Sequence, residues 1–238
     1  MALRWTPALV RFCHQMDTTV PARCVRFSEN AALWAQVATA YGALVIRAPV
    51  TQGDVVLVIP ASGGVGKAAI ELVVQAGGVA IGVTRSAAKA AAIRDDGAAH
   101  IIVTSEDDLV ERVQAITGGE GVAVVFDALT DDALMADLVT VTRSGGAIVQ
   151  FGGIGGSPLT LPLVQFIAKG LKYYGYSLCE MCTDAAALDP LRAFVVKGVT
   201  AGAFKLRVGK VFPFEEMVEV HRYLEAGSMD GSVVVRVS

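Results

Sequence analysis

The feature that most constrains the fold is a run of strand-forming residues that stops at a glycine-rich turn. Residues 55–59 read VVLVI, the turn PASGGVG follows directly, and residues 67–76 are typical of a helix. An unbroken β-branched run predicts a strand covered on both faces, as in a parallel sheet. The first N–H groups of the helix have no partner within it and bind phosphate well. The segment therefore predicts a dinucleotide-binding strand, loop and helix.

Each glycine of the loop has a distinct expected role. Gly63 would let the backbone approach the phosphates, and Gly66 would let the helix pack closely on the strand. Ala61 stands where the usual fingerprint has its first glycine, so the loop reads A-x-G-x-x-G. Such a match is also compatible with a plain tight turn, but a second strand ending about 20 residues further on favours a cofactor site. The predicted contacts of the loop are Ser62, Gly63, Gly64 and Val65.

The end of the second expected strand indicates which dinucleotide is bound. NAD sites usually place an acidic residue there, whereas this chain has Thr84, Arg85 and Ser86, with Lys89 one helical turn later. Two cations and two hydroxyls suit a 2′-phosphate, which a carboxylate would repel. Alternatively, Arg85 and Lys89 are ordinary solvated residues, although a cation at a helix start opposes the helix dipole. We therefore predict NADP(H) rather than NAD.

Strand-like and helix-like segments alternate over most of the chain. After the first strand, further strands are expected at 79–84, 101–103, 122–126, 147–151 and 172–178, with helices between them and a first helix over 31–45. This rhythm predicts an α/β fold with a doubly wound parallel sheet (a Rossmann fold). The expected domains are a segment of uncertain structure over 1–27, with a short strand near 22–27, a Rossmann domain over 28–204, and a strand–helix–strand piece over 205–238.

Charge and hydropathy exclude several classes of protein. The net charge is −3 and no run of like charges occurs, so we expect no nucleic-acid partner. Gly, Pro and charged residues interrupt every apolar stretch, so we expect no membrane span. The first 21 residues do not contain the apolar run of a signal peptide, and four cysteines fit reduced thiols. We therefore expect a cytoplasmic protein.

No metal site or catalytic set stands out. Cys179 and Cys182 have the spacing of half a zinc site, but the other ligands would have to come from the distant Cys13, His14 or Cys24. We therefore favour reduced thiols and predict no metal. Tyr41 is a possible proton donor, although an aromatic residue at this helical position is more often part of the core. No residue is assigned a catalytic role.

Several motifs in order resemble the medium-chain dehydrogenase/reductase superfamily, within its zinc-free quinone oxidoreductase branch. They are AALW at 31–34, TAYGAL at 39–44, the glycine loop, ITGG at 116–119, VVFD at 124–127 and HRYLEAG at 221–227. The resemblance covers residues 28–238. Members of that family begin with a catalytic β-domain too long for the residues that precede the first helix here. Residues 205–238 would be the remnant of that domain.

The resemblance implies further contacts with the cofactor. Thr39 would lie near the nicotinamide and Thr104 near the adenosine part, and Asp127 at the end of the fourth strand would also be close. The turn after the fifth strand would add Phe151, Gly152 and Gly153. Thr130 replaces a glycine that is usual in the family, which affects the surroundings of Asp127. The family also implies a homodimer formed through the sheet edge near residues 172–178.

Two functions are compatible with the sequence. The first is an NADPH-dependent reductase, without zinc, of a quinone or an α,β-unsaturated carbonyl that acts by hydride transfer. The alternative is a non-catalytic or partner-dependent NADP-binding module, in which another protein completes the active site. The sequence favours the first because no residue expected at the cofactor site has been lost.

Overall fold

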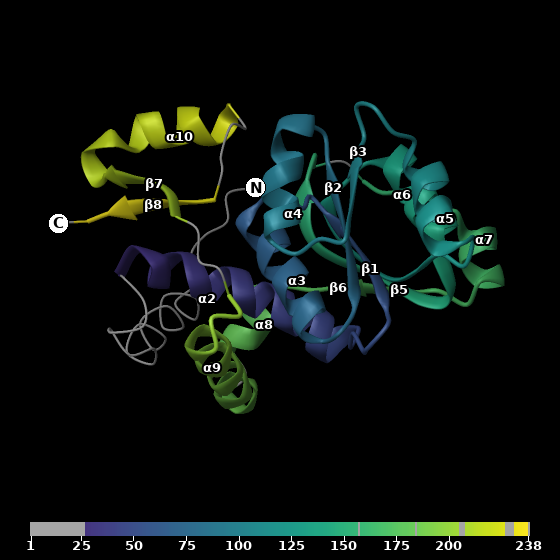
Figure 1. Ribbon diagram of the computed structural model, residues 1–238, viewed down its shortest axis with the longest axis horizontal. Coiled ribbons are helices and arrows are strands. Elements are labelled where there is room, and N and C mark those ends of the chain that lie inside the picture. Colours follow the sequence, from purple (N-terminus) through teal and green to yellow (C-terminus); the bar gives the residue numbers. More distant parts are fainter. Residues whose placement is uncertain (1–26, 157, 184, 205–207, 227–230, 238) are drawn as a thin grey trace. The chain divides into compact units, whose positions relative to one another are not determined.

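A computed structural model describes residues 27–156, 158–183, 185–204, 208–226 and 231–237 (Figure 1). The chain divides into two compact units. The larger unit comprises residues 40–62 and 66–177, and the smaller one comprises the described parts of 1–39, 63–65 and 178–238. The strand predicted near residues 22–27 lies outside the described residues, apart from Phe27, which begins a helix. The domain boundaries expected at 27/28 and 204/205 stay a prediction.

A six-stranded parallel sheet forms the centre of the larger unit and confirms the predicted α/β fold. Its strands lie in the order β3-β2-β1-β4-β5-β6, which is the order of a doubly wound dinucleotide-binding sheet. The strands are β1 (Val55–Ile59), β2 (Val79–Thr84), β3 (His100–Val103), β4 (Val122–Leu129), β5 (Thr142–Ile154) and β6 (Lys172–Gly175). The chain order reverses between β1 and β4, which is where such sheets bind their ligands.

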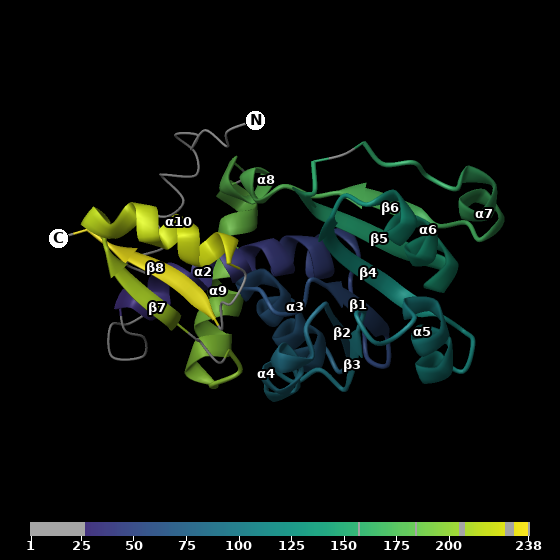
Figure 2. The same ribbon diagram turned by 90° about the horizontal axis from the view of Figure 1, so that it is seen from above.

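Helices cover both faces of this sheet (Figures 1 and 2). Leu57 and Ile59 of β1 belong to an apolar core with side chains of α5 and α6, including Val113 and Leu138. On the opposite face, Ile93 of α4 packs on Gly82 of β2, where a Cβ would lie 2.5 Å from its side chain. The helices of this unit are α3 (Gly64–Gln75), η2 (Ala87–Lys89), α4 (Ala90–Asp95), α5 (Leu109–Thr117), α6 (Asp132–Val141) and α7 (Leu163–Ala168).

Side-chain caps fix where α5 and α6 begin. Asp108 accepts a hydrogen bond from the N–H of Glu111 at 2.8 Å, and Asp131 accepts one from Leu134 at 2.8 Å. A carboxylate at the N-cap pairs an N–H that the helix leaves without a partner. Gly118, with φ of 62°, ends α5 in the left-handed region. These caps explain why α5 begins at Leu109 and α6 at Asp132.

The smaller unit contains the C-terminal strand–helix–strand piece that the sequence predicts. β7 (Val208–Pro213) and β8 (Ser232–Arg236) pair in parallel, and α10 (Met217–Glu225) connects them after the short η3 (Phe214–Glu216). The ring of Phe212 lies 5.7 Å from that of Tyr223, and Lys210 Nζ lies 4.4 Å above the Phe212 ring. The unit also contains α8 (Leu178–Thr183), α9 (Ala185–Thr200) and most of α2 (Phe27–Tyr41).

The bounds of the first helix and of the sixth strand differ from the sequence prediction. The first helix does not continue to residue 45 as an α-helix, because it becomes the π-helix η1 (Gly42–Arg47). The change of helix type occurs at Gly42, where Tyr176 packs closely on the backbone. A Cβ at Gly42 would overlap the phenol ring of Tyr176. The sixth strand ends at Gly175 instead of residue 178, and α8 begins at Leu178. No helix within the described ranges is both long enough and apolar enough to cross a membrane.

Lys169 closes the C-terminal end of α6. Its Nζ donates to the carbonyl oxygens of Val139, Thr140 and Thr142 at 3.0, 2.6 and 2.7 Å. Burial lowers the pKa of Lys169. A cation is favourable here because the carbonyls at the end of a helix carry partial negative charge.

We expect Lys169→Met to lower the free energy of unfolding by about 2 kcal/mol, because three carbonyls lose a charged donor. Urea unfolding followed by circular dichroism measures the change. Lys197→Met, at an exposed position of α9, serves as the control and should leave stability nearly unchanged. Equal urea midpoints for the two variants would contradict this account of Lys169.

Candidate cofactor site

The predicted site residues of the larger unit gather at the carboxyl edge of the sheet. The strand pairing aligns Ile59 with Asp127, Asp127 with Gln150, and Gln150 with Gly175. β1 ends at this row and the glycine loop follows. The row therefore lies at the carboxyl ends of β1 and β4, between which the strand order reverses, and open α/β sheets bind ligands at that position.

The glycine loop has the strand, turn and helix that the sequence predicts. A Cβ at Gly66 would overlap the carbonyl oxygens of Pro60 and Ala61, so α3 can pack this closely on β1 only with glycine. Gly63 is different, because no atom of the described residues, apart from its chain neighbours, lies within 4 Å of where its Cβ would be. Its backbone is therefore open to an approaching group. Ser62 and Val65 are half-buried beside it, and their contact with a cofactor stays a prediction.

Within the smaller unit, Gln36 covers Gly64. A Cβ at Gly64 would overlap the carboxamide of Gln36, whose Nε2 donates to Ser232 Oγ at 2.6 Å. The sequence analysis did not identify Gln36, because no motif links it to the loop. The predicted nicotinamide neighbour Thr39 lies one turn further along α2. Its side chain is buried, and its Oγ1 donates to the carbonyl of Ala35 at 2.7 Å.

The residues predicted for the 2′-phosphate follow directly on β2. Thr84 is buried, and its Oγ1 accepts a hydrogen bond from the N–H of Ser86 at 3.2 Å. Arg85 is exposed, and Lys89 is half-buried at the end of η2. The N–H of Thr104 donates to the carbonyl of Thr84 at 2.9 Å, which places the predicted adenosine contact beside the predicted phosphate contacts.

Asp127 is an unusual carboxyl group in the row. Its side chain is 1% exposed, and Oδ1 accepts a hydrogen bond from the N–H of Leu129 at 2.9 Å. Among the described residues, Oδ2 has no hydrogen-bond partner. Burial raises the pKa of Asp127 to about 6. A carboxyl with this pKa changes charge near neutral pH, and its second oxygen is buried without a partner within the described residues.

Gln150 lies beside Asp127 on the neighbouring strand, and Tyr173 contacts Gln150. Neither residue was predicted from the sequence. Gln150 Nε2 donates to the carbonyls of Leu129 and Gly152 at 2.8 and 2.9 Å. The hydroxyl of Tyr173 lies 3.4 Å from Gln150 Oε1. Burial, and next the charge of Asp127, raise the pKa of Tyr173. Only the register of β4, β5 and β6 reveals these neighbours, and sequence patterns do not specify register.

The predicted turn after the fifth strand is corrected by the structure. β5 does not end at residue 151 but continues through Gly152 and Gly153 to Ile154. It is extended because Leu129 pairs with Ile154, and the N–H of Thr130 donates to the Ile154 carbonyl at 2.8 Å. The ring of Phe151 stacks on Phe126 with centroids 3.9 Å apart. Gly153 is exposed beyond this stacked pair.

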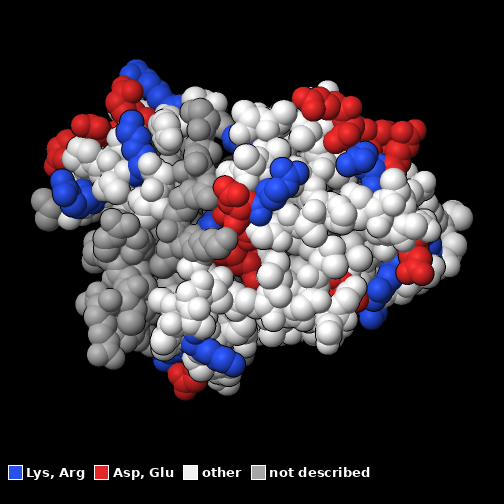
Figure 3. Space-filling view, viewed as in Figure 1, with Lys and Arg blue, Asp and Glu red and all other residues white. Residues whose placement is uncertain are grey.

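The described residues contain no group of three or more His, Cys, Asp or Glu side chains that could hold a metal ion. Cys179 and Cys182 lie one turn apart on α8 and are partly exposed. Figure 3 shows one face of the molecule, on which acidic and basic side chains are interspersed and separated by broad uncharged areas.

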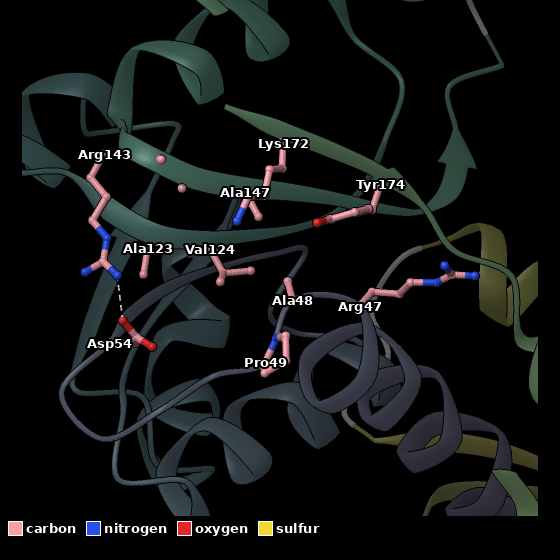
Figure 4. A pocket seen from close by; sticks show the side chains of 12 residues that line it. Arg47, Ala48, Pro49, Asp54, Ala123, Val124, Arg143, Ala147, Lys172 and Tyr174 are labelled. Atoms are coloured by element: carbon pink, nitrogen blue, oxygen red, sulfur yellow. Dashed lines mark hydrogen bonds and ion pairs between the residues drawn. The ribbon is translucent and has the colours of Figure 1, made fainter. Parts of the chain in front are cut away.

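A small cavity lies at the opposite, amino-terminal edge of the sheet (Figure 4). Its volume is about 230 Å³, and Arg143 and Asp54 form an ion pair of 2.9 Å at one side. Arg47 points away from the other lining residues (Figure 4). Because the cavity is lined by residues before β1 and at the starts of β4, β5 and β6, it is separate from the predicted cofactor site.

Comparison with known proteins identifies the relatives of this chain. Residues 64–191 match the family model described as zinc-binding dehydrogenase. The 2-haloacrylate reductase of a Burkholderia species is 29% identical over 188 residues, which are 78% of this chain and 56% of that protein. Quinone oxidoreductase 1 of Escherichia coli is 29% identical over 211 residues, which are 87% of this chain and 64% of that protein. The chain thus spans 56–64% of the length of these two relatives.

A solved structure agrees with these relationships. The structure of E. coli quinone oxidoreductase complexed with NADPH superposes with a TM-score of 0.83 at 27% identity. The match covers 92% of this chain and 67% of that one.

We expect Asp127→Asn to remove a titration that destabilises the fold at high pH. The pKa of Asp127 is about 6 in the fold and 3.8 is its ordinary value, so the folded chain binds the proton more tightly. The stability from this proton is fully present below about pH 4 and is lost as the pH rises through 6. Between about pH 4 and pH 8, the wild type should lose about 3 kcal/mol more than the variant.

Urea unfolding at a series of pH values measures this difference. Glu120→Gln changes an exposed carboxyl and serves as the control, which should follow the wild type at every pH. Parallel pH profiles for the wild type and Asp127→Asn would show that the carboxyl is not perturbed in this way.

Proposed function

Because the chain belongs to the zinc-binding dehydrogenase family, as a quinone oxidoreductase-like member of the medium-chain dehydrogenase/reductase superfamily, we propose that it is an NADPH-dependent reductase. The proposed substrate is a quinone or an α,β-unsaturated carbonyl compound. The relatives support this class, since their names include quinone oxidoreductases and a reductase of a haloacrylate, which carries a conjugated double bond. The proposal requires no zinc.

The observation that carries the proposal is the geometry of the glycine loop. Gly66 brings α3 against β1, and Gly63 leaves an open stretch of backbone beside the first turn of that helix. The N–H groups of such a turn can bind a pyrophosphate, and the helix dipole favours its negative charge. Arg85 and Lys89, with the hydroxyls of Thr84 and Ser86, are the proposed partners of the 2′-phosphate.

The chain's residues would mainly bind and orient the reactants. Bound NADPH supplies a hydride from C4 of the nicotinamide to the electrophilic carbon of the substrate. Proposed contacts with the rest of the cofactor come from Thr39, Thr104, Asp127, Phe151, Gly152 and Gly153. The oxygen that becomes negative on reduction requires a proton or a hydrogen-bond donor, and solvent can supply the proton.

An NADP-binding module that depends on a partner is the second candidate. In this candidate function, a further polypeptide completes the active site. In this case the chain binds NADPH but does not turn over substrate alone. We propose a cytoplasmic location for either function, because four cysteines in a chain of 238 residues are suited to a reducing compartment.

We expect the purified chain to oxidise NADPH, followed at 340 nm, when a quinone or an enone is added. NADH should be used less well, because it has no 2′-phosphate for Arg85 and Lys89 to bind. Binding of NADPH without turnover would support the module, and absence of NADPH binding would contradict both functions.

Gly63→Ala tests the loop directly. The added methyl group has room in the fold, but it lies where the pyrophosphate would approach, so we expect NADPH to bind about tenfold more weakly at unchanged stability. Gly175→Ala adds the same group at an equally open position of β6 and serves as the control. Equal NADPH affinities for the two variants would place the pyrophosphate elsewhere.

We also propose a homodimer formed through the outer edge of β6. In the described sheet β6 pairs only with β5, which leaves its other edge open. An open edge presents unpaired N–H and C=O groups, which a second copy can pair. Val164 and Ile167 of the neighbouring α7 are 85% and 66% exposed and would add apolar contact.

We expect light scattering at micromolar concentration to give the mass of two chains. A single-chain mass at that concentration would contradict this interface.

A further inference from the structure

A buried cluster of three charged side chains joins α3 to the end of α4, and each of these helices follows predicted phosphate contacts. Lys67 Nζ of α3 lies 2.6 Å from Oδ1 of Asp96, which directly follows α4, and 3.1 Å from Oε1 of Glu71. Lys67, Glu71 and Asp96 are 8%, 6% and 8% exposed. Removing charges from water is costly, so such a cluster does not by itself stabilise a fold. The position of the cluster between α3 and the end of α4 indicates that it contributes to their placement.

Each end of the Lys67–Asp96 pair is poorly placed with respect to its own helix. Lys67 lies in the first turn of α3, where the helix dipole disfavours a cation. Asp96 is the C-cap of α4, where the dipole disfavours an anion. Neither helix is stabilised by its own charge, and the interaction becomes favourable only when the two helices are side by side. The pair therefore acts as a link between α3 and α4.

The two linked helices begin at different parts of the predicted cofactor site. α3 follows the glycine loop, where the pyrophosphate is expected. η2 follows Arg85 and ends at Lys89, and α4 begins at the next residue. At the middle of α4, Ile93 packs on Gly82, and at its end Gly97 lies against Val74 of α3. The Lys67–Asp96 ion pair adds a polar contact between α3 and the end of α4.

We propose that Lys67 and Asp96 are positioning residues for cofactor selection: by fixing α4 against α3, they hold Arg85 and Lys89 at the separation from the glycine loop that NADPH requires. The inference rests on the proposed NADPH-dependent function. Lys67 takes part through Asp96, because its Nζ is held within the cluster.

The cluster offers two substitutions that are matched in charge. Asp96→Ala removes the link between the helices but leaves Lys67 paired with Glu71. Glu71→Ala removes the partner on the same helix but leaves Lys67 paired with Asp96. Each variant retains one lysine and one carboxylate in the cluster, so neither leaves a lone buried charge. Only the first variant breaks the ion pair between α3 and the end of α4.

Fluorescence titration of both variants and the wild type with NADPH and with NADH tests the proposal. We expect Asp96→Ala to weaken NADPH binding by about fivefold to tenfold, while the affinity for NADH changes by less than about twofold. Glu71→Ala should leave the ratio of the two affinities close to that of the wild type. A purely structural role of Asp96 would weaken both cofactors alike, because both contain the pyrophosphate.

The outcomes separate this inference from the proposed function. A wild type that prefers NADPH, together with an unchanged preference in Asp96→Ala, would overturn the inference alone. A wild type that binds neither cofactor would overturn the proposed function and this inference with it. If Asp96→Ala does not fold, Asp96→Asn retains a hydrogen-bond acceptor for Lys67 without the charge. It should then shift the preference in the same direction, and an unchanged preference would overturn the inference.

Discussion

The close approach of α3 to β1 is the constraint on which the rest of the larger unit depends. The carbonyl oxygens of Pro60 and Ala61 occupy the place where a side chain at Gly66 would be, so the helix can begin immediately after the strand. This directs the first turn of α3 toward the carboxyl edge of the sheet. β1 pairs with β4 on one side and with β2 on the other, so the predicted site inherits its geometry from this contact.

Small residues also allow close packing next to the contact between α3 and β1. Gly82 lets Ile93 approach β2, and the N–H of Ala61 donates to the carbonyl of Val83 at 2.9 Å. Ala61, the end of β2 and α4 thereby form one packed group. Arg85 and Lys89, which we propose for phosphate recognition, lie between β2 and α4 of this packed group, and such preorganisation favours selective binding of a charged ligand.

The sequence predicted most of the fold because its elements have strong local patterns. The β-branched run at 55–59 and the glycines after it specify a strand, a turn and a helix without any information from the rest of the chain. β2 was predicted with its bounds. The extent of β5 was not, since its last residues are extended only because Leu129 and Thr130 pair with Ile154.

The site residues also divide into those that local patterns indicate and those that depend on long-range contacts. Glycine and charge patterns indicated the loop and the region after β2, whereas Gln36, Gln150 and Tyr173 depend on tertiary packing and strand register. The Lys67–Asp96 pair also joins residues 29 positions apart that no motif connects. Local chemistry can be read from a sequence, but the partners of a buried polar group require a structure.

The contact between Gln36 and Gly64 has a consequence for how this chain can change over time. The carboxamide of Gln36 occupies the space that any side chain at position 64 would need, and it is held there by Ser232. The two positions therefore cannot vary independently: a larger residue at 64 becomes acceptable only after position 36 has become smaller. Sequence drift in the glycine loop is thus coupled to a helix that begins before it and to a strand near the C-terminus.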